Sequence, residues 1–204
     1  MPEFKLYYFK LHGRACAARA LLAHSKTDYE NIEIGFPEWP ELKPTMPNQQ
    51  VPCLELADGT KMGQSIAITR YLGIVKGYYP KDAMQAYKVD SLIDRYMDVI
   101  TVYKPHFMQD GPEKDALIKK GFEETLPKWL AEMEIVTAEG KFLVGDTLTI
   151  ADFFIGSFYT DFVLNEHMTF GRDQWVTCLD NFPNFKAYCE RYAAENKDYL
   201  EKRN

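Results

Sequence analysis

The first third of the chain alternates short strand-like and helix-like stretches. Residues 4–9 have the aromatic and apolar content of a strand, and residues 15–25 are built largely from alanine and leucine, which favour helix. The Asp58-Gly59 pair between two short apolar runs predicts a hairpin. In all, the pattern predicts strands over residues 4–9, 29–34, 51–56 and 61–62 and helices over residues 15–25 and 65–76.

Everything after Pro80 has helical periodicity, and we find no strand pattern there. Thr149 and Asp152 have the spacing of a capping box, in which a hydroxyl and a carboxylate satisfy backbone amides at the start of a helix. We therefore interpret Asp152 as structural. Glycine and proline residues divide this part into predicted helices over residues 83–109, 113–138, 149–165 and 182–193.

The order of these elements indicates an α+β chain with two domains. A β-α-β unit followed by β-β-α suits a small mixed sheet with helices packed on it, which is the thioredoxin-like arrangement. We expect this thioredoxin-like domain to span residues 1–78. An all-α domain is expected over residues 83–204.

Composition narrows the class of protein and its partners. The chain has 204 residues, of which 46% are hydrophobic, and this excludes disordered and collagen-like proteins. Its formal charge is -6 and it has no run of Lys and Arg, so we expect no nucleic-acid partner. No stretch reaches the roughly 18 apolar residues of a membrane span, and the first residues lack the pattern of a secretory leader. We expect no membrane partner and a cytoplasmic location.

The cysteines and histidines do not predict a disulfide scaffold or a metal site. No two cysteines form a C-x-x-C pair, and the histidines lack the i, i+4 spacing of a helical metal site. We expect four reduced, mostly buried thiols and no metal. The residues concerned are Cys16, Cys53, Cys178 and Cys189, and His12, His24, His106 and His167.

Five segments carry a recognisable combination of motifs: Leu6-x-Tyr8-Phe9-x-Leu11-x-Gly13-Arg14, Trp39-Pro40-Glu41-Leu42-Lys43, Pro47-x-x-Gln50-Val51-Pro52-x-Leu54-Glu55, Gln64-Ser65-Ile66-Ala67-Ile68-x-Arg70-Tyr71-Leu72 and Val144-Gly145-Asp146-x-Leu148-Thr149-x-Ala151-Asp152. Together they resemble the sigma-type class of cytosolic glutathione transferases, over nearly the whole chain. Three positions depart from that pattern, because His12 stands where Arg is usual, Cys16 where Glu is common, and Asn48-Gln49 in place of Phe-Gly.

The resemblance implies an enzyme that activates glutathione as a thiolate and adds it to electrophilic small molecules. Peroxide reduction and prostaglandin-type isomerisation are further activities of such proteins. Glutathione is then the co-substrate, and neither a metal nor a nucleotide is required. A different class stays open, because some sigma-like proteins are structural lens crystallins with little activity, and a ligand carrier is another alternative.

Tyr8 is the expected thiolate activator. It ends the first strand just before the turn to Gly13 and Arg14, where a phenol can donate to the glutathione sulfur and favour its charged form. We expect Arg14 to order Tyr8 or to interact with the thiolate. The alternatives are a core aromatic at Tyr8, the neighbouring Tyr7 as donor, and a surface salt bridge for Arg14.

Two anion sites are expected for the carboxylates of glutathione. Gln64-Ser65 lies where a strand ends and a helix begins, so the Ser65 hydroxyl and helix amides converge on the γ-glutamyl carboxylate. A plain N-cap is the alternative. The resemblance assigns Trp39 and Lys43 to the glycyl carboxylate, with Gln50 as a further donor, whereas packing of Trp39 and a solvated Lys43 are the alternative.

The Val51-Pro52 bond is expected to be cis. The resemblance places it where the glutathione backbone pairs with Val51 like an added strand. A trans proline that starts a strand is the alternative.

The second substrate needs an apolar wall beside the thiolate, drawn from the first loop and the helical domain. Aromatic residues at helical spacing are usually core residues, so a packing role stays open for each of them. His12 is a candidate donor to an oxygen of the electrophile, or an exposed side chain. The candidates are Phe9, His12, Ile100, Tyr103, Phe107 and Phe154.

A charged stripe on the first long helix after Pro80 bears on assembly. Asp90, Asp94 and Asp98 repeat at i, i+4, which places like charges on one face. The resemblance implies a homodimer in which Asp98 reaches the glutathione ammonium bound in the partner. A solvated acidic face is the alternative.

Overall fold

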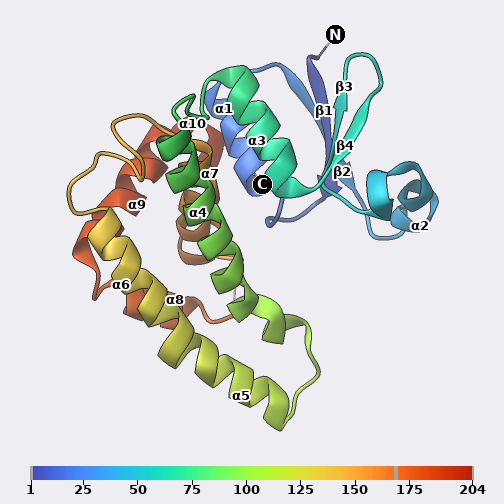
Figure 1. Ribbon diagram of the computed structural model, residues 1–204. Helices are drawn as coiled ribbons and strands as arrows, with labels where there is room; N and C mark the ends of the chain where they lie inside the picture. The colour runs from blue at the N-terminus through green and yellow to red at the C-terminus, as the bar shows by residue number, and fades with distance from the viewer. Residues whose placement is uncertain (1, 168–169, 204) are drawn as a thin grey trace.

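The computed structural model describes residues 2–167 and 170–203, apart from the side chains of residues 103, 104, 106 and 107. The first part of the chain forms a sheet with helices, as predicted (Figure 1). Its elements are β1 (Phe4–Phe9), α1 (Cys16–His24), β2 (Tyr29–Ile34), α2 (Trp39–Leu42), the 3₁₀ turns η1 (Lys43–Thr45) and η2 (Pro47–Gln49), β3 (Cys53–Leu56), β4 (Lys61–Gly63) and α3 (Ser65–Lys76).

The four strands form the predicted mixed sheet in the order β2-β1-β3-β4. Strand β1 pairs in parallel with β2 and antiparallel with β3, and β3 pairs antiparallel with β4. Because side chains alternate along a strand, Phe4, Leu6 and Tyr8 of β1 are buried in the core, while the residues between them are half-buried on the other face. Tyr8 is thus the last inward-facing residue before the β1–α1 turn.

The second part of the chain is helical throughout residues 83–167 and 170–200, apart from its connecting turns. No described helix is long and apolar enough to cross a membrane. The elements are α4 (Ala83–Val99), η3 (Ile100–Phe107), α5 (Pro112–Lys120), η4 (Gly121–Thr125), α6 (Leu126–Val136), α7 (Ile150–Phe158), η5 (Tyr159–Val163), α8 (Arg172–Leu179), α9 (Pro183–Glu195) and α10 (Lys197–Leu200).

The long predicted helices are interrupted. The helix predicted over residues 83–109 is α-helical only to Val99 and continues as the 3₁₀ turn η3, which contains Pro105, a residue without a backbone N–H. The helices predicted over residues 113–138 and 149–165 contain the π turns η4 and η5. Helix α8 was not predicted, because it buries only Trp175 and Leu179, which is too few apolar positions for a clear period.

The capping box at the start of α7 is confirmed. The Asp152 carboxylate accepts hydrogen bonds from the Thr149 backbone N–H at 2.7 Å, the Leu143 N–H at 3.0 Å and the Tyr188 hydroxyl at 3.1 Å. Asp152 is fully buried, and this burial raises the pKa of its carboxyl. Its donors hold α7 against α9 and the preceding loop, so the residue is structural.

The two parts of the chain pack through α1, α3, α4 and α7 (Figure 1). His24 of α1 lies 2.7 Å from the Tyr78 hydroxyl and packs edge-on against Phe153 of α7. Arg70 of α3 donates two hydrogen bonds to Asp90 of α4. Asp90 of the acidic stripe on α4 is therefore paired with a cation of the same chain.

Candidate active site

The Tyr8 hydroxyl is fixed by the turn that follows β1. The backbone N–H of Arg14 donates to the Tyr8 oxygen at 3.1 Å. Gly13 has φ +144°, which a side chain would strain, and a Cβ there would lie 3.0 Å from that oxygen, so a side chain at this position would press on the Tyr8 hydroxyl. Because the oxygen accepts from Arg14, its own proton remains available for donation to a ligand.

Burial sets the protonation of this phenol. Tyr8 is 7% exposed, and burial raises the pKa of its hydroxyl, while the hydrogen bond from the Arg14 amide acts in the opposite direction. The guanidinium of Arg19 lies 5.4 Å from the centre of the Tyr8 ring. At neutral pH Tyr8 is therefore a hydrogen-bond donor and not a base.

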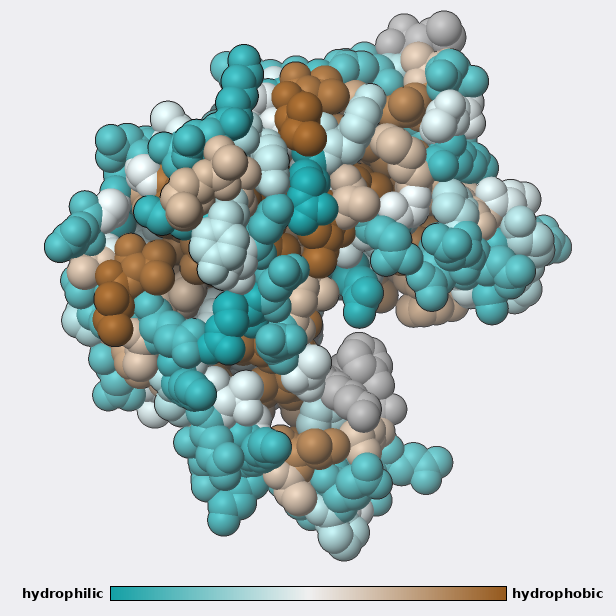
Figure 2. All heavy atoms as spheres, in the orientation of Figure 1, coloured by the Kyte–Doolittle hydropathy of each residue, from teal (hydrophilic) through white to brown (hydrophobic). Residues whose placement is uncertain are grey.

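A cavity of about 100 Å³ opens beside this turn. The face of the molecule is hollowed between the N-terminal domain and the α5 end of the helical domain (Figure 2). The cavity is lined by parts of the β1–α1 turn, the start of α3, the end of α4 and helix α7 with its π turn. Among the predicted site residues, the structure brings Arg14, Ser65, Ile100 and Phe154 together here.

The start of α3 borders the cavity through Ser65. Gln64 has φ 71° and ψ 109°, a strained conformation for a residue with a side chain, and Ser65 behind it is 7% exposed. Among the described residues no side chain caps this helix. Ser65 lines the cavity, and helix amides without a side-chain cap are groups that can bind a carboxylate.

The residues predicted to bind the glycyl carboxylate of glutathione lie on α2 and in the segment that follows it. Trp39 opens α2 and is half-buried, and Lys43 follows the helix and is exposed, as is Gln50. The Val51-Pro52 peptide bond is cis, so that prediction is confirmed. Val51 is half-buried against the core beside β3.

Two predictions for the wall of the second substrate need correction. Phe9 does not line the cavity. Its ring lies 5.8 Å from the Tyr8 ring but stacks on Phe36 at 5.0 Å and meets Trp39 edge-on at 5.3 Å, and neither of these two residues lines the cavity. His12 lines a different cavity, of about 280 Å³, formed with β2 and the C-terminal segment. The side chains of Tyr103 and Phe107 lie outside the described residues.

Asp98 lies away from the site of its own chain. It is exposed on α4 and borders a separate surface hollow with Arg95 and Lys128. It therefore contacts glutathione only if a second chain brings it there.

Several lining residues were not predicted from the sequence. Met97, Ser157, Asp161 and Phe162 also border the cavity. The sequence does mark Asp161 as unusual, because it is a carboxylate inside the apolar run over residues 153–164. In the structure this side chain is only 2% exposed. Cys16, beside it, is fully buried, and burial together with Asp161 raises the pKa of its thiol well above the ordinary value, so Cys16 is not an activated nucleophile.

Comparisons with known proteins show the family to which this fold belongs. Residues 2–73 match the family model described as glutathione S-transferase, N-terminal domain, and residues 97–203 match the one described as glutathione S-transferase, C-terminal domain. The chain is 33% identical to glutathione S-transferase 4 of Caenorhabditis elegans, over 98% of this chain and 100% of the relative. It is 30% identical to S-crystallin SL11 of Nototodarus sloanii, over 100% of this chain and 98% of the relative.

A solved structure shares the whole fold. The structure described as prostaglandin synthase D of Nilaparvata lugens superposes with a TM-score of 0.83 at 27% identity, covering 100% of both chains. The sheet-and-helix arrangement and the helical second part are therefore common to these proteins.

Proposed function

The chain belongs to the glutathione S-transferase family, and from this premise we propose that Tyr8 activates glutathione as a thiolate for transfer to electrophilic small molecules. The observation that carries the proposal is the Tyr8 hydroxyl, oriented by the Arg14 amide beside an open cavity. A donor held in place stabilises the thiolate without reorganising during the reaction. The start of α1 lies nearby and favours the same charge.

The two ends of glutathione are charged, and the chain offers a partner for each. Ser65 and the first amides of α3 suit the γ-glutamyl carboxylate, and Trp39 with Lys43 and Gln50 suits the glycyl carboxylate. Val51 is proposed to pair with the peptide backbone between them. Arg14 is proposed to act through its amide on Tyr8 and through its side chain at the cavity mouth.

The electrophile is proposed to bind in the cavity next to the thiolate. Ile100 and Phe154 supply its apolar wall, with Met97 and Phe162 beside them. Asp161 and Ser157 are polar lining groups that would favour an electrophile carrying a hydrogen-bonding group. Detoxification of reactive small molecules is the role that fits this arrangement.

A second candidate activity follows from the relatives. Because the structure described as a prostaglandin synthase has the same fold over its full length, isomerisation of a prostaglandin-type substrate is proposed as a further activity to assay, with peroxide reduction beside it. Because the chain is also similar to an S-crystallin, a structural role is the alternative to an enzyme. The retained Tyr8, Ser65, Trp39 and Lys43 favour the enzyme.

We further propose a homodimer in which α3 and α4 face the partner. Large apolar side chains are exposed on these helices, namely Ile74 at 61%, Met84 at 62% and Tyr87 at 65%. Asp98 is exposed on α4 as well, one turn after Asp94. In such a dimer the partner's Asp98 would meet the ammonium of the bound glutathione.

The proposed compartment is the cytoplasm. All four cysteines are free thiols, and thiols stay reduced in that compartment. The proposed transfer step needs no metal, because Tyr8 and the amide donors stabilise the thiolate directly.

One experiment separates the enzyme from its alternatives. The purified protein is passed over immobilised glutathione, eluted with free glutathione, and assayed against a panel of electrophiles, a peroxide and a prostaglandin endoperoxide. Retention with turnover of one acceptor supports the proposal. Retention without any turnover would favour a crystallin-like or carrier role. Failure to bind glutathione would contradict the proposed glutathione transferase activity.

A further inference from the structure

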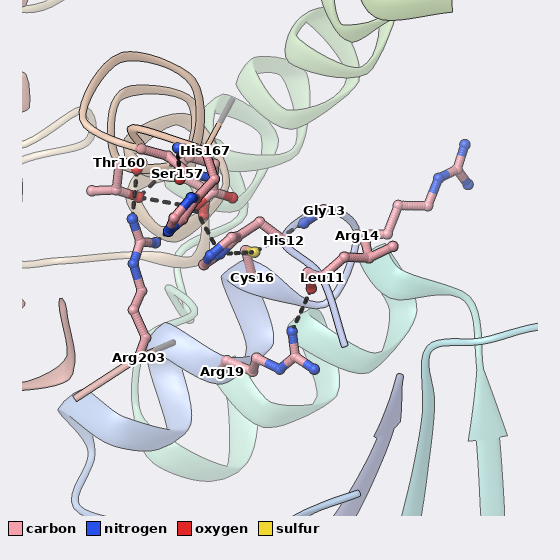
Figure 3. Close-up of polar contacts among 12 residues, drawn as sticks. Leu11, His12, Gly13, Arg14, Cys16, Arg19, Ser157, Thr160, His167 and Arg203 are labelled. Carbon is pink, nitrogen blue, oxygen red and sulfur yellow. Dashed lines mark hydrogen bonds and ion pairs between the residues drawn. The ribbon is translucent and has the colours of Figure 1, made fainter. Parts of the chain in front are cut away.

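Three side chains able to bind a metal meet where the β1–α1 turn contacts the helical domain (Figure 3). His12 lies in that turn, Cys16 is the first residue of α1, and Asp161 lies in the π turn η5. His12 Nδ1 is 3.8 Å from Cys16 Sγ and 3.8 Å from Asp161 Oδ1. One ligand atom from each residue lies within 4.8 Å of the other two, so the three donors surround one point.

The separation between His12 and Cys16 suits a small tetrahedral ion. With bond lengths of about 2.3 Å to sulfur and about 2.0 Å to nitrogen, a tetrahedral zinc ion holds its sulfur and nitrogen ligands about 3.5 Å apart. The observed 3.8 Å between His12 Nδ1 and Cys16 Sγ needs only a small closure to reach that distance. One thiolate, one imidazole and one carboxylate are also ligands that Zn²⁺ accepts together.

Burial distinguishes this cluster from ordinary acidic groups on a surface. Cys16 and Asp161 are each 2% exposed, and the His12 side chain is 19% exposed. The Gly13 backbone N–H donates to Cys16 Sγ at 3.0 Å, which would stabilise negative charge on the sulfur of a bound thiolate. His12 borders the larger cavity and Asp161 borders the cavity near Tyr8, so the cluster lies in the wall between them.

We propose that His12, Cys16 and Asp161 form a binding site for one thiophilic divalent cation of the Zn²⁺ type, with water in the fourth position. On binding, the Cys16 thiol loses its proton to solvent and the sulfur bonds to the ion. His12 binds through the Nδ1 lone pair of its neutral ring, and Asp161 binds through a carboxylate oxygen. The thiolate and carboxylate together balance the two charges of the ion. The bound ion would link the β1–α1 turn to η5.

Arg203 competes with the ion for Asp161. The Arg203 Nη1 atom lies 2.7 Å from Asp161 Oδ1, and Arg203 belongs to the C-terminal segment. An ion must displace this guanidinium or share the carboxylate with it. Removing the guanidinium should therefore tighten ion binding, which is the opposite of what losing a ligand does.

The same three residues do not have the geometry of a nucleophilic relay. In a Cys-His-Asp relay the imidazole contacts the thiol through one ring nitrogen and the carboxylate through the other. Here both 3.8 Å separations end on His12 Nδ1. A single nitrogen facing both groups is the arrangement of a metal ligand.

The site is tested by titrating the protein with Co²⁺, followed by displacement with Zn²⁺, in buffer without glutathione because glutathione binds both ions. One Co²⁺ per chain should bind and give a thiolate-to-cobalt charge-transfer band, which Zn²⁺ should abolish. Cys16→Ser should lose the band and bind more than about 100-fold more weakly, since a direct ligand matters more than an outer-shell partner. Cys178→Ser changes a half-buried thiol on α8 and should leave the band unchanged.

If circular dichroism shows that Cys16→Ser is unfolded, two further variants still test the proposal. His12→Ala should weaken Co²⁺ binding while keeping the thiol, and Arg203→Gln should strengthen it several-fold. Absence of the charge-transfer band in the unmodified protein would overturn the proposal. So would equal Co²⁺ affinity in His12→Ala and the unmodified protein, or weaker binding by Arg203→Gln.

Discussion

The backbone N–H of Arg14 donates a 3.1 Å hydrogen bond to the hydroxyl oxygen of Tyr8. This contact uses the hydroxyl oxygen as an acceptor and leaves the Tyr8 proton available for donation to a ligand, which is the role proposed for it towards the glutathione sulfur. The orientation of Tyr8 therefore depends on the backbone of the turn, and the side chain of Arg14 is not needed for it.

Replacing Tyr8 with Phe should lower turnover on the order of 10²-fold and leave glutathione binding nearly intact, because one preorganised donor to the thiolate is lost. Thiolate absorbance of bound glutathione, followed against pH, should show a higher apparent pKa of the thiol in the variant. The same apparent pKa in both proteins would mean that Tyr8 is not the activator.

Replacing Gly13 with Ala should lower turnover about tenfold or more, since the new Cβ would press on the Tyr8 oxygen from 3.0 Å and move the donor. Strain at φ +144° should also cost about 1–3 kcal/mol of unfolding free energy. Steady-state kinetics and urea unfolding measure the two effects separately.

Gly59→Ala is the matched control for this variant. Gly59 has φ +85°, but a Cβ there meets nothing within 4 Å. It should lose stability of the same order and keep full turnover. A parallel loss of turnover in Gly59→Ala would show that strain alone, and not contact with Tyr8, lowers the rate.

Acid should weaken the contact between the two parts of the chain through His24. Burial lowers the pKa of His24 below its usual 6.5, and the ring lies 2.7 Å from the Tyr78 hydroxyl. The folded protein thus binds this proton less readily than the unfolded chain. The contribution is full above about pH 6.5 and is lost as the pH falls through the lowered pKa.

Urea unfolding at pH 7.5 and pH 5.5 measures this dependence. The unmodified protein should lose more unfolding free energy between these two values than His24→Gln, which cannot be protonated in this range. Identical losses in the two proteins would assign the acid sensitivity to other groups.

Asp98→Asn should weaken glutathione binding by about 1 to 3 kcal/mol, the loss of a charge-assisted hydrogen bond across the proposed dimer, without dissociating it. Asp94→Asn is the matched control, because Asp94 is also exposed on α4 one turn earlier. Glutathione KM and sedimentation at micromolar concentration measure both properties. An unchanged KM for Asp98→Asn, or a monomer in the unmodified protein, would contradict the shared site.

The local features of the chain were predictable from its sequence. The strand Phe4–Phe9 and the helix Ser65–Lys76 have the predicted bounds, because β-forming residues and a strand-to-helix break are properties of neighbouring residues. The capping box of Thr149 and Asp152 was predictable for the same reason, since both partners lie within one helical turn. The mixed sheet followed from the order of these elements.

The candidate site was predictable only where motif residues carry it. Tyr8, Arg14 and Ser65 stand at element ends whose positions the sequence fixes locally, and the structure brings them to one region. Phe9 was predicted as a wall residue, but its ring packs on Phe36 and Trp39, which belong to the segment after β2. That packing joins segments far apart in the sequence, so the strand pattern around Phe9 could not predict it.

By itself, then, the sequence determined the elements, their order and the motif-bearing turns, since these depend on short-range hydrogen bonds and on the period of apolar residues. Only the tertiary structure decided that His12 and Cys16 meet Asp161 and Arg203, which are more than 140 residues away along the chain. It also decided that the long helices widen into π turns, where Gly121 and Val102 pack too closely for a Cβ. These features arise from packing between distant segments, and no local pattern records such packing.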